Sequence, residues 1–235
     1  MSHKLIVVTG GTRGIGRAIV EIFARNGFDV VASARKEKDL QQLQQFITTE
    51  YKVNCFIYPA DLGVKTQVLG LGSFIQSLNR NVDVIVNNAG NFIPGNIHEE
   101  ADGVLESLIE TNLYSAYNLT RGLIKEMIAQ RSGHIFNMCS VASLMAYPNG
   151  GSYSISKFAL LGFSKCLREE MKPYNIKVTS IMPGAVLTDS WAGVDIPAER
   201  FMSADDVAKT IWTAYNLSDS AVIEEIVMRP QKGDI

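Results

Sequence analysis

The strongest constraint on the fold is a regular alternation of short apolar runs with segments of helical periodicity. Residues 4–9 (KLIVVT) form a β-branched run, residues 14–26 place apolar side chains at helical spacing, and Gly27 closes that helix. The same pattern repeats along the chain. It predicts further strands at 29–34, 53–60, 83–86, 134–140, 176–182 and 222–228, and further helices at 36–51, 64–80, 98–109, 113–131, 152–172 and 203–216.

Repeated strand–helix units with nearly continuous apolar strands indicate an α/β fold. Buried on both faces, such strands form a parallel sheet, and right-handed crossovers place helices on both of its sides. We therefore expect a Rossmann-type doubly wound parallel sheet of about seven strands. The 235 residues contain no Pro/Gly/Ser-rich linker and no repeat, so residues 1–235 are expected to form a single domain.

Composition and charge exclude several classes of protein. The net charge of −2 provides no basic field for nucleic acid or an anionic membrane. Three cysteines at scattered positions, Cys55, Cys139 and Cys166, match neither a disulfide framework nor a metal cluster. The first apolar run meets glycines at once, which favours a strand over a signal peptide, and no run approaches the ~18 apolar residues of a membrane span. We expect a cytoplasmic protein without a metal, a nucleic-acid partner or a membrane segment.

A glycine-rich turn, TGGTRGIG at 9–16, joins the first strand to the first helix. A dinucleotide pyrophosphate needs a backbone that it can approach closely and free N–H groups at a helix N-terminus. Gly10, Gly14 and Gly16 meet that need, although their spacing is G-x-x-x-G-x-G and not the commoner G-x-G-x-x-G. Many glycine-rich turns are structural only. The position of this one favours nucleotide binding.

The end of the second predicted strand indicates which dinucleotide binds. Enzymes that select NAD place a carboxylate there for the ribose hydroxyls, whereas this chain has Arg35 followed by Lys36. Arg13 lies in the glycine turn, and guanidinium groups are good bidentate ligands for a 2′-phosphate. NADP(H) is therefore expected over NAD(H). In the alternative interpretation Arg35 and Lys36 are solvated loop charges and Glu37 folds back to the ribose.

Tyr153 and Lys157 are the expected acid–base pair. At spacing i, i+4 on a helix the phenol and the ammonium share one face. A free tyrosine has a pKa near ~10, and a neighbouring ammonium typically lowers it by ~1–3 units. This spacing alone is common by chance. Ser140, at the end of the preceding strand, and Asn112, at the start of a long helix, strengthen the assignment, because ligands bind at strand ends in open α/β sheets.

Taken together, the motifs resemble those of the short-chain dehydrogenase/reductase family along essentially the whole chain. They occur in the family's order: TGGTRGIG at 9–16, Asp61-Leu62, NNAG at 87–90, Asn112, Ser140, YSISK at 153–157 and PGAVLT at 183–188. The C-terminal stretch VIEEIVMRPQKGDI, together with PGAVLTDSW, is similar to the bacterial sepiapterin-reductase-like branch. Each motif alone has low specificity, and their combination is very specific.

The resemblance implies a role for each matching position. Tyr153 is the general acid in reduction and the base in oxidation, and Ser140 polarises the substrate oxygen. Lys157 lowers the pKa of the tyrosine and binds the ribose, and Asn112 positions a water that relays protons to Lys157. The cofactor site also includes Thr12 and Ile15 in the glycine turn, Asp61 and Leu62 at the adenine, Asn88, Ala89 and Gly90 at the ribose, and Pro183, Gly184, Val186 and Thr188 at the nicotinamide amide.

The expected function is an NADP(H)-dependent oxidoreductase that transfers hydride between the nicotinamide and a carbonyl or alcohol substrate. Sepiapterin or another small ketone or diketone is one substrate class. The alternatives are a 3-oxoacyl-thioester (acyl-carrier-protein) reductase, a polyol or steroid alcohol dehydrogenase, and an NADP(H)-sensing regulator or scaffold without chemistry. The last class usually lacks the Tyr/Lys pair that is present here.

Two further expectations concern surfaces. The segments 141–151 and 189–202 are expected to select the substrate, and Trp191 is either a wall of the pocket or a hydrophobic plug at the sheet edge. The helices near 113–131 and 152–172 are more apolar than one sheet face requires. In the resembling family these helices form subunit interfaces, so a homo-dimer or homo-tetramer is expected.

Overall fold

A seven-stranded parallel sheet organises the described part of the chain, which in this computed structural model is residues 3–188, 191, 193 and 195–235. Its strands run in the order β3-β2-β1-β4-β5-β6-β7, and all neighbours are parallel. The bounds are β1 (Leu5–Thr9), β2 (Asp29–Ala34), β3 (Cys55–Pro59), β4 (Val84–Asn87), β5 (Gly133–Met138), β6 (Ile176–Pro183) and β7 (Glu225–Met228). The predicted Rossmann-type doubly wound sheet is confirmed.

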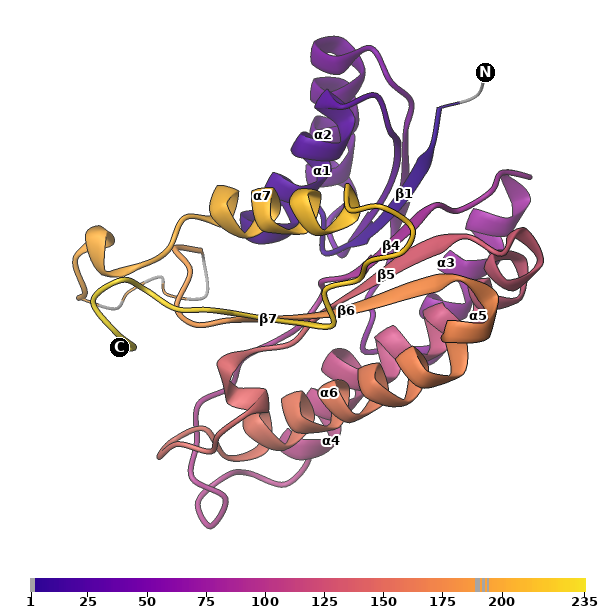
Figure 1. The fold of residues 1–235 in the computed structure, drawn as a ribbon. Coiled ribbons are helices and arrows are strands. Elements are labelled where there is room, and N and C mark those ends of the chain that lie inside the picture. The colour runs from indigo at the N-terminus through magenta and orange to yellow at the C-terminus, as the bar shows by residue number, and fades with distance from the viewer. Residues whose placement is uncertain (1–2, 189–190, 192, 194) are drawn as a thin grey trace.

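Helices cover both faces of this sheet (Figure 1). On one face lie α1 (Gly14–Arg25), α2 (Glu37–Tyr51) and α7 (Ala204–Tyr215), and on the other α3 (Lys65–Ser77), α5 (Ser115–Gln130) and α6 (Gly151–Met171). The short helix α4 (Val104–Ile109) contacts α6. The connections contain 3₁₀ turns, among them η2 (Val141–Ser143), η3 (Lys172–Tyr174) and η5 (Ala198–Arg200). Within the described residues no helix is long and apolar enough to cross a membrane.

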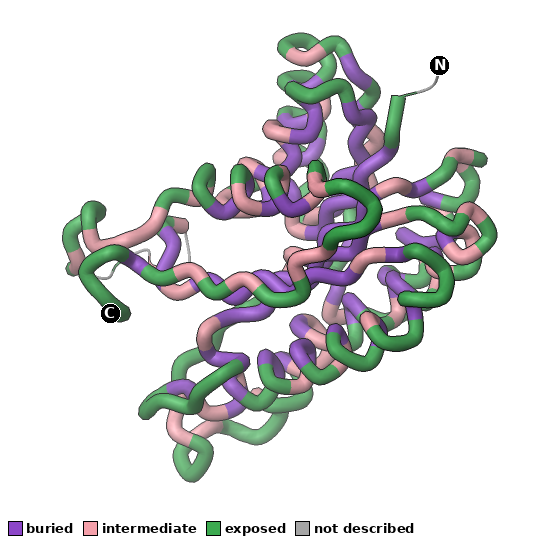
Figure 2. The backbone as a smooth tube through the Cα atoms, in the orientation of Figure 1, coloured by how far each residue is buried: buried purple, intermediate pink, exposed green. Residues whose placement is uncertain are grey.

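The two layers of core follow from the alternation of side chains along each strand. Ile6 and Val8 of β1 face α1, α2 and α7, whereas Leu5 and Val7 face α3, α5 and α6. All four are at most 1% exposed. Figure 2 shows this burial concentrated in the central sheet, with exposed residues on the outer sides of the helices. Both faces are therefore apolar, which explains why the strands are nearly continuous apolar runs in the sequence.

The helix predicted at 98–109 is shorter in the structure, where α4 begins only at Val104. In the residues before it, the backbone N–H groups of Glu99 and Glu100 both donate to the Asn96 carbonyl, and Gly103 enters the helix with a positive φ of 90°. These residues form a turn in place of the predicted first helical turns. A π-helical turn, η1 (Glu110–Tyr114), then joins α4 to α5, so the two helices predicted at 98–109 and 113–131 are one continuous helical run.

Two predicted strands also differ at their ends. The strand predicted at 134–140 ends at Met138, because Ser140 is the N-cap of η2: its Oγ accepts a hydrogen bond from the Ala142 backbone N–H (3.1 Å). The backbone N–H of Ser140 in turn donates to Ser143 Oγ (3.2 Å). The strand predicted at 222–228 begins at Glu225. The early end of β5 therefore places Ser140 just beyond the carboxyl end of the strand.

Candidate active site

The candidate active site lies where the strand order reverses. Successive strands extend from β1 through β2 to β3 on one side and from β4 through β5 and β6 to β7 on the other. Ligands of open α/β sheets bind beyond the carboxyl ends of the strands at this point. The glycine turn follows β1, residues 88–90 follow β4, and Ser140 follows β5. The fold thus brings these three predicted groups to one edge.

The glycine turn leaves no room for side chains at its key positions. A Cβ on Gly16 would lie 2.1 Å from the Gly10 carbonyl oxygen and 2.6 Å from Asn88 Nδ2. Gly10 and Gly14 have positive φ values of 66° and 52°. No side-chain hydrogen bond caps α1 and its described first turn contains no acidic residue, so its N–H groups suit an anion. This turn therefore fits a dinucleotide pyrophosphate, with Thr12 and Ile15 half-buried in it.

Asn88 and Thr9 fasten the glycine turn to the end of β4. Asn88 Nδ2 donates to the carbonyls of Thr9 (2.9 Å) and Gly10 (3.2 Å). In the other direction, the backbone N–H groups of Asn88 and Ala89 both donate to Thr9 Oγ1 at 3.0 Å. Sequence reasoning did not assign Thr9 to the site. The available signal is that it is a buried polar residue ending an otherwise apolar strand.

The expected adenosine end carries the two predicted arginines. The backbone N–H of Gly10 donates to the Ser33 carbonyl (2.8 Å), which ties the turn to the end of β2 just before Arg35. Arg13 and Arg35 are both exposed. Asp61, after β3, is also exposed, and its Oδ1 accepts the Gly63 N–H (3.0 Å). Leu62 beside it is buried. The geometry leaves two guanidinium groups on the solvent side of this end.

Asn112 occupies the π-helical turn η1 and is 1% exposed. Its Nδ2 donates to the Asn91 carbonyl (3.0 Å) and to Ser156 Oγ (2.9 Å), while its Oδ1 accepts the Asn91 N–H (2.7 Å). The extra residue in a π turn rotates a side chain out of the regular helical ladder, and such turns are frequent at functional sites. Asn112 thereby joins the segment after β4 to α6. Asn91 and Ser156 were not identified from the sequence.

Lys157 is buried at the same junction, with 5% of its surface exposed. Its Nζ donates to the Met138 carbonyl at the end of β5 (2.8 Å). A Cβ added to Gly90 would lie 3.3 Å from this Nζ and 3.1 Å from Asn112 Oδ1, so the three residues meet. Burial lowers the pKa of Lys157 to about 8, with a smaller opposing effect from Cys139. Lys157 is thus a cation held inside the site and sensitive to mildly alkaline pH.

Tyr153 lies one helical turn before Lys157. Burial raises the pKa of Tyr153 to about 12, and its side-chain hydrogen bond with Ser140 acts in the opposite direction. Lys157 Nζ lies 5.8 Å from the centre of the tyrosine ring. The expected lowering of the tyrosine pKa by this lysine is therefore wrong for the protein alone. Burial dominates the pKa of Tyr153, and the ammonium of Lys157 is bound to the Met138 carbonyl.

Ser140 and Cys139 follow β5 and have different environments. Ser140 is 8% exposed and hydrogen-bonds with Tyr153, as a residue at the reacting end of the site should. Cys139 is 2% exposed, and burial raises the pKa of its thiol. It therefore packs as a small apolar residue, the interpretation preferred from the sequence over a nucleophile. Among the described residues no group of His, Cys, Asp or Glu is arranged to hold a metal ion.

Residues 183–188 begin at the last residue of β6 and reach the glycine turn at Thr188. The N–H of Gly184 donates to the Met228 carbonyl (2.8 Å), and a Cβ on Gly14 would meet Thr188 Cγ2 at 3.0 Å. Pro183 and Val186 are buried. In the segment expected to select the substrate, residues 189, 190, 192 and 194 lie outside the described residues.

Aromatic side chains surround this region. The ring of Trp191 packs edge-on against Phe201, with centroids 5.2 Å apart. The ring of Phe92 contacts the Tyr153 ring edge-to-face, with centroids 4.9 Å apart. The sequence provides no signal for the second contact beyond the position of Phe92, two residues after the NNAG motif. Tyr153 is therefore held by an aromatic neighbour that belongs to a different segment.

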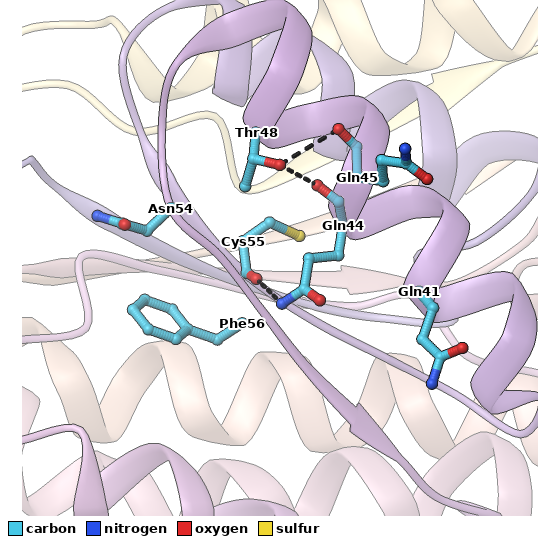
Figure 3. Close-up of a pocket in the computed structure, with 7 residues that line it drawn as sticks. All are labelled: Gln41, Gln44, Gln45, Thr48, Asn54, Cys55 and Phe56. Atoms are coloured by element: carbon cyan, nitrogen blue, oxygen red, sulfur yellow. Dashed lines mark hydrogen bonds between the residues drawn. The ribbon is translucent and has the colours of Figure 1, made fainter.

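A separate hollow lies against the opposite, amino-terminal end of β3 (Figure 3). Gln44 Nε2 donates to the Cys55 carbonyl there (2.6 Å), which satisfies an outward-facing group of this edge strand. Its lining is mostly amide and hydroxyl side chains: Gln41, Gln44, Gln45, Thr48, Asn54, Cys55 and Phe56. Burial raises the pKa of the Cys55 thiol to about 12. These side chains make no acid–base pair, and the hollow does not compete with the site at the strand ends.

Comparison with known proteins shows the family to which the chain belongs. The family model described as short chain dehydrogenase matches residues 4–197. The chain is similar to the sepiapterin reductase of Chlorobaculum tepidum, with 33% identity covering 100% of this chain and 99% of that protein. It is also 31% identical to a 3-oxoacyl-[acyl-carrier-protein] reductase of Haemophilus influenzae, over 94% of this chain and 93% of the relative.

Solved structures show the same likeness. An alcohol dehydrogenase from Thermococcus sibiricus, complexed with 5-hydroxy-NADP, is 25% identical with a TM-score of 0.91 and covers 97% of each chain. L-sorbose reductase from Gluconobacter frateurii, complexed with NADPH and L-sorbose, is 27% identical with a TM-score of 0.88, over 98% of this chain and 96% of that one. The protein therefore belongs to the short-chain dehydrogenase/reductase family, and it is an oxidoreductase that acts on carbonyl and alcohol groups.

Proposed function

We propose that the protein is an NADP(H)-dependent reductase of small ketones or diketones, with Tyr153 as the general acid in reduction and the base in oxidation. One observation carries the proposal: Tyr153 is hydrogen-bonded to Ser140 at the end of β5, in a site that also buries Lys157 and Asn112. The glycine turn that suits a pyrophosphate lies at the same sheet edge.

NADP(H) fits the residues of this edge, and when bound it would supply or accept the hydride. Gly10, Gly14 and Gly16 leave the close backbone approach that a pyrophosphate needs. Arg13 and Arg35 would bind a 2′-phosphate. The remaining cofactor contacts would come from Thr12, Ile15, Asp61, Leu62, Asn88, Ala89, Gly90, Lys157, Pro183, Gly184, Val186 and Thr188. NADPH-bound and NADP-bound relatives support this choice of cofactor for the family.

The reaction would depend on two hydroxyl donors. With a pKa of about 12, Tyr153 holds its proton at neutral pH and is ready to donate it. As the carbonyl oxygen gains charge, Tyr153 and Ser140 would both donate hydrogen bonds to it. Lys157, charged below a pH of about 8, would stabilise the tyrosinate left after proton transfer. Asn112 would position a water that relays protons to Lys157.

The surface beside Tyr153 supports a neutral, apolar or aromatic substrate. Phe92 packs on Tyr153, and large apolar side chains on the neighbouring segments are between 38% and 52% exposed: Phe92, Leu144, Met145, Tyr147 and Leu187. A planar carbonyl compound would bury such side chains. Similarity to a sepiapterin reductase over the whole chain favours a pterin-like ketone within this class. Similarity to a 3-oxoacyl-thioester reductase keeps that activity as the second candidate.

A carbonyl panel scored by NADPH oxidation tests the proposal. It contains sepiapterin, simple aliphatic and aromatic diketones, and acetoacetyl thioesters, with NADH as the control cofactor. We expect NADPH-dependent reduction that Tyr153→Phe abolishes while NADPH still binds. Undiminished turnover by Tyr153→Phe would disprove the mechanism. A higher kcat/KM for acetoacetyl thioesters than for every diketone would favour the second candidate.

We also propose that the protein is a homo-dimer or homo-tetramer through α5 and α6. Tyr117 on α5 and Ile155 and Phe158 on α6 are 39%, 41% and 45% exposed. A surface that buries such side chains is typical of homo-oligomer interfaces. Light scattering after size-exclusion chromatography measures the mass, and a monomer at micromolar concentration would contradict this part of the proposal.

A further inference from the structure

We propose that Glu100 is a positioning residue for Tyr153, because its carboxylate caps the N-terminus of α6 from a distant part of the chain. The inference rests on the proposed function, in which Tyr153 is the acid–base group. Glu100 precedes α4 and is separated by about fifty residues of sequence from the helix that it caps. Neither the glycine turn nor the predicted set of site residues includes it.

The cap consists of two hydrogen bonds to Ser152. The Ser152 backbone N–H donates to Glu100 Oε1 (3.0 Å), and Ser152 Oγ donates to Oε2 of the same carboxylate. Ser152 is the second residue of α6 and is 3% exposed. Tyr153 follows it directly. The N-cap position of α6 is Gly150, which has no side chain with which to bond the free N–H groups.

The backbone around Glu100 is paired with the same helix end. The Gly151 N–H donates to the Gly95 carbonyl (3.1 Å), and the Gly95 N–H donates to the Asn149 carbonyl (3.0 Å). Asn96 accepts the Glu100 N–H at its carbonyl (3.0 Å) and the Asn149 N–H at its Oδ1 (3.1 Å). Figure 1 shows the two connections side by side at the beginning of α6. The cap is therefore one part of a built contact between two loops.

Two glycines make room for the carboxylate. A Cβ on Gly151 would lie 2.5 Å from Glu100 Oε1, and a Cβ on Gly95 would lie 2.8 Å from Glu100 Cγ. Any larger residue at either position would displace the glutamate from the helix end. A carboxylate is also the group best suited to this place, because the N-terminus of a helix carries partial positive charge and its N–H groups donate strongly to an anion.

The same segment also contacts the side chain of Tyr153. Phe92 precedes Glu100 in the connection after β4, and its ring packs edge-on against the tyrosine ring. The connection therefore holds Tyr153 at its backbone through Ser152 and at its ring through Phe92. Lys157, one turn further along α6, has its own anchor on the Met138 carbonyl. Loss of the cap should consequently loosen Tyr153 and leave the lysine and the cofactor contacts in place.

Steady-state kinetics of three variants test this role. Glu100→Ala removes the cap, Glu100→Gln keeps an amide of the same shape, and Glu99→Ala is the matched control. Glu99 is exposed and its Oε2 accepts a hydrogen bond from Asn96 Nδ2 (3.0 Å). We expect Glu100→Ala to lower kcat at least tenfold with KM for NADPH within twofold of the wild type. Glu100→Gln should restore at least a third of kcat, and Glu99→Ala should match the wild type.

The pH profile of alcohol oxidation separates positioning from a simple effect of charge. Removal of a negative charge would lower the pKa of a nearby tyrosine, so a charge effect would shift the profiles of both Glu100 variants to lower pH. Positioning predicts an unshifted profile for Glu100→Gln, which keeps a hydrogen-bonding group at the helix end, so only Glu100→Ala should differ from the wild type. Equal shifts of both variants to lower pH would overturn the inference.

Two further results would also overturn it. One is a kcat of Glu100→Ala within twofold of the wild type. The other is a fall in kcat that equals the fall in the number of NADPH-binding sites per chain. If Glu100→Ala does not fold, Ser152→Ala is the deciding variant, because it removes one of the two hydrogen bonds to the carboxylate. A threefold or larger fall in kcat supports the role, and an unchanged kcat refutes it.

Tyr153→Phe is measured in parallel. Activity retained by Tyr153→Phe rejects the proposed function, whereas an inactive Tyr153→Phe with an unaffected Glu100→Ala rejects the Glu100 inference alone.

Discussion

Asn91 and Asn112 bind each other through two opposed hydrogen bonds: the Asn91 N–H donates to Asn112 Oδ1 (2.7 Å), and Asn112 Nδ2 donates to the Asn91 carbonyl (3.0 Å). A buried side chain thereby holds the backbone of the connection that follows β4. The same Nδ2 also donates to Ser156 on α6. Asn112 thus connects the segment that follows β4 to the helix that carries Tyr153.

Asn112→Ala should therefore lower kcat by about tenfold to a hundredfold, because small displacements of reacting groups can cost about that much. KM for NADPH should change less, since the glycine turn is untouched. Steady-state kinetics with varied NADPH measure both. Asn26→Ala is the control, as it removes an exposed amide that donates to the Ile22 carbonyl. A kcat within twofold of the wild type would contradict the role of Asn112 in connecting the segment after β4 to α6.

The reduction rate should be level below a pH of about 8 and fall above it. Lys157 has a pKa of about 8 in the folded protein, so rising pH removes its charge, whereas Tyr153 keeps its proton until about 12. The rate is measured as kcat for reduction between pH 6 and 10. Lys157→Met should lack this alkaline limb and have a much lower kcat throughout. A wild-type limb that is equally present in Lys157→Met would assign it to another group.

The lowered pKa of Lys157 also predicts the pH dependence of stability. Its pKa is about 8 in the folded protein, against the ordinary lysine value of 10.5 in the unfolded chain, so the unfolded chain binds more protons between these values. The free energy of unfolding of the wild type relative to Lys157→Met should therefore rise from pH 8 to 10.5, by up to about 3 kcal/mol. Urea unfolding of both proteins at several pH values measures this difference. A fall over the same range would contradict the buried, charged lysine.

Gly16→Ala should disrupt the glycine turn. The added Cβ would lie 2.1 Å from a backbone oxygen of Gly10, and backbone cannot yield as a flexible side chain does. We expect a loss of about 1–3 kcal/mol of stability, together with NADPH binding too weak to detect at micromolar protein. Fluorescence titration of NADPH and thermal unfolding measure the two effects. Gly72→Ala, in α3 with open space around its Cβ position, should bind NADPH as the wild type does.

Arg35→Ala should reduce the preference for NADPH. A charge-assisted hydrogen bond to a phosphate contributes about 1.5–3 kcal/mol, so kcat/KM for NADPH should fall roughly 10- to 100-fold while that for NADH stays within threefold. The ratio of the two constants is the measurement. Lys36→Ala, the neighbouring exposed cation, is the control and should change the ratio less. An equal fall with both cofactors would place Arg35 outside the 2′-phosphate site.

Local sequence patterns were sufficient to predict most of the fold. The apolar strands and the periodic helices correspond to β1–β7 and the long helices, because the period of burial is a local property of strands and helices. The pattern misjudged the residues before α4. There the chain takes its conformation from hydrogen bonds to 149–152 in a distant loop, and no local period records such bonds.

For the site, the sequence alone determined which residue types were available and which strand ends they follow: the glycines after β1, Asn88 after β4, Ser140 after β5, and Tyr153 and Lys157 one turn apart. Only the tertiary structure decided the pKa values of these residues and the hydrogen bonds that hold them in place. Burial depends on the whole packed molecule, so the tyrosine pKa rises although a lysine is near. Likewise, Glu100 and Asn112 act on α6 through contacts that form only when segments far apart in the sequence meet.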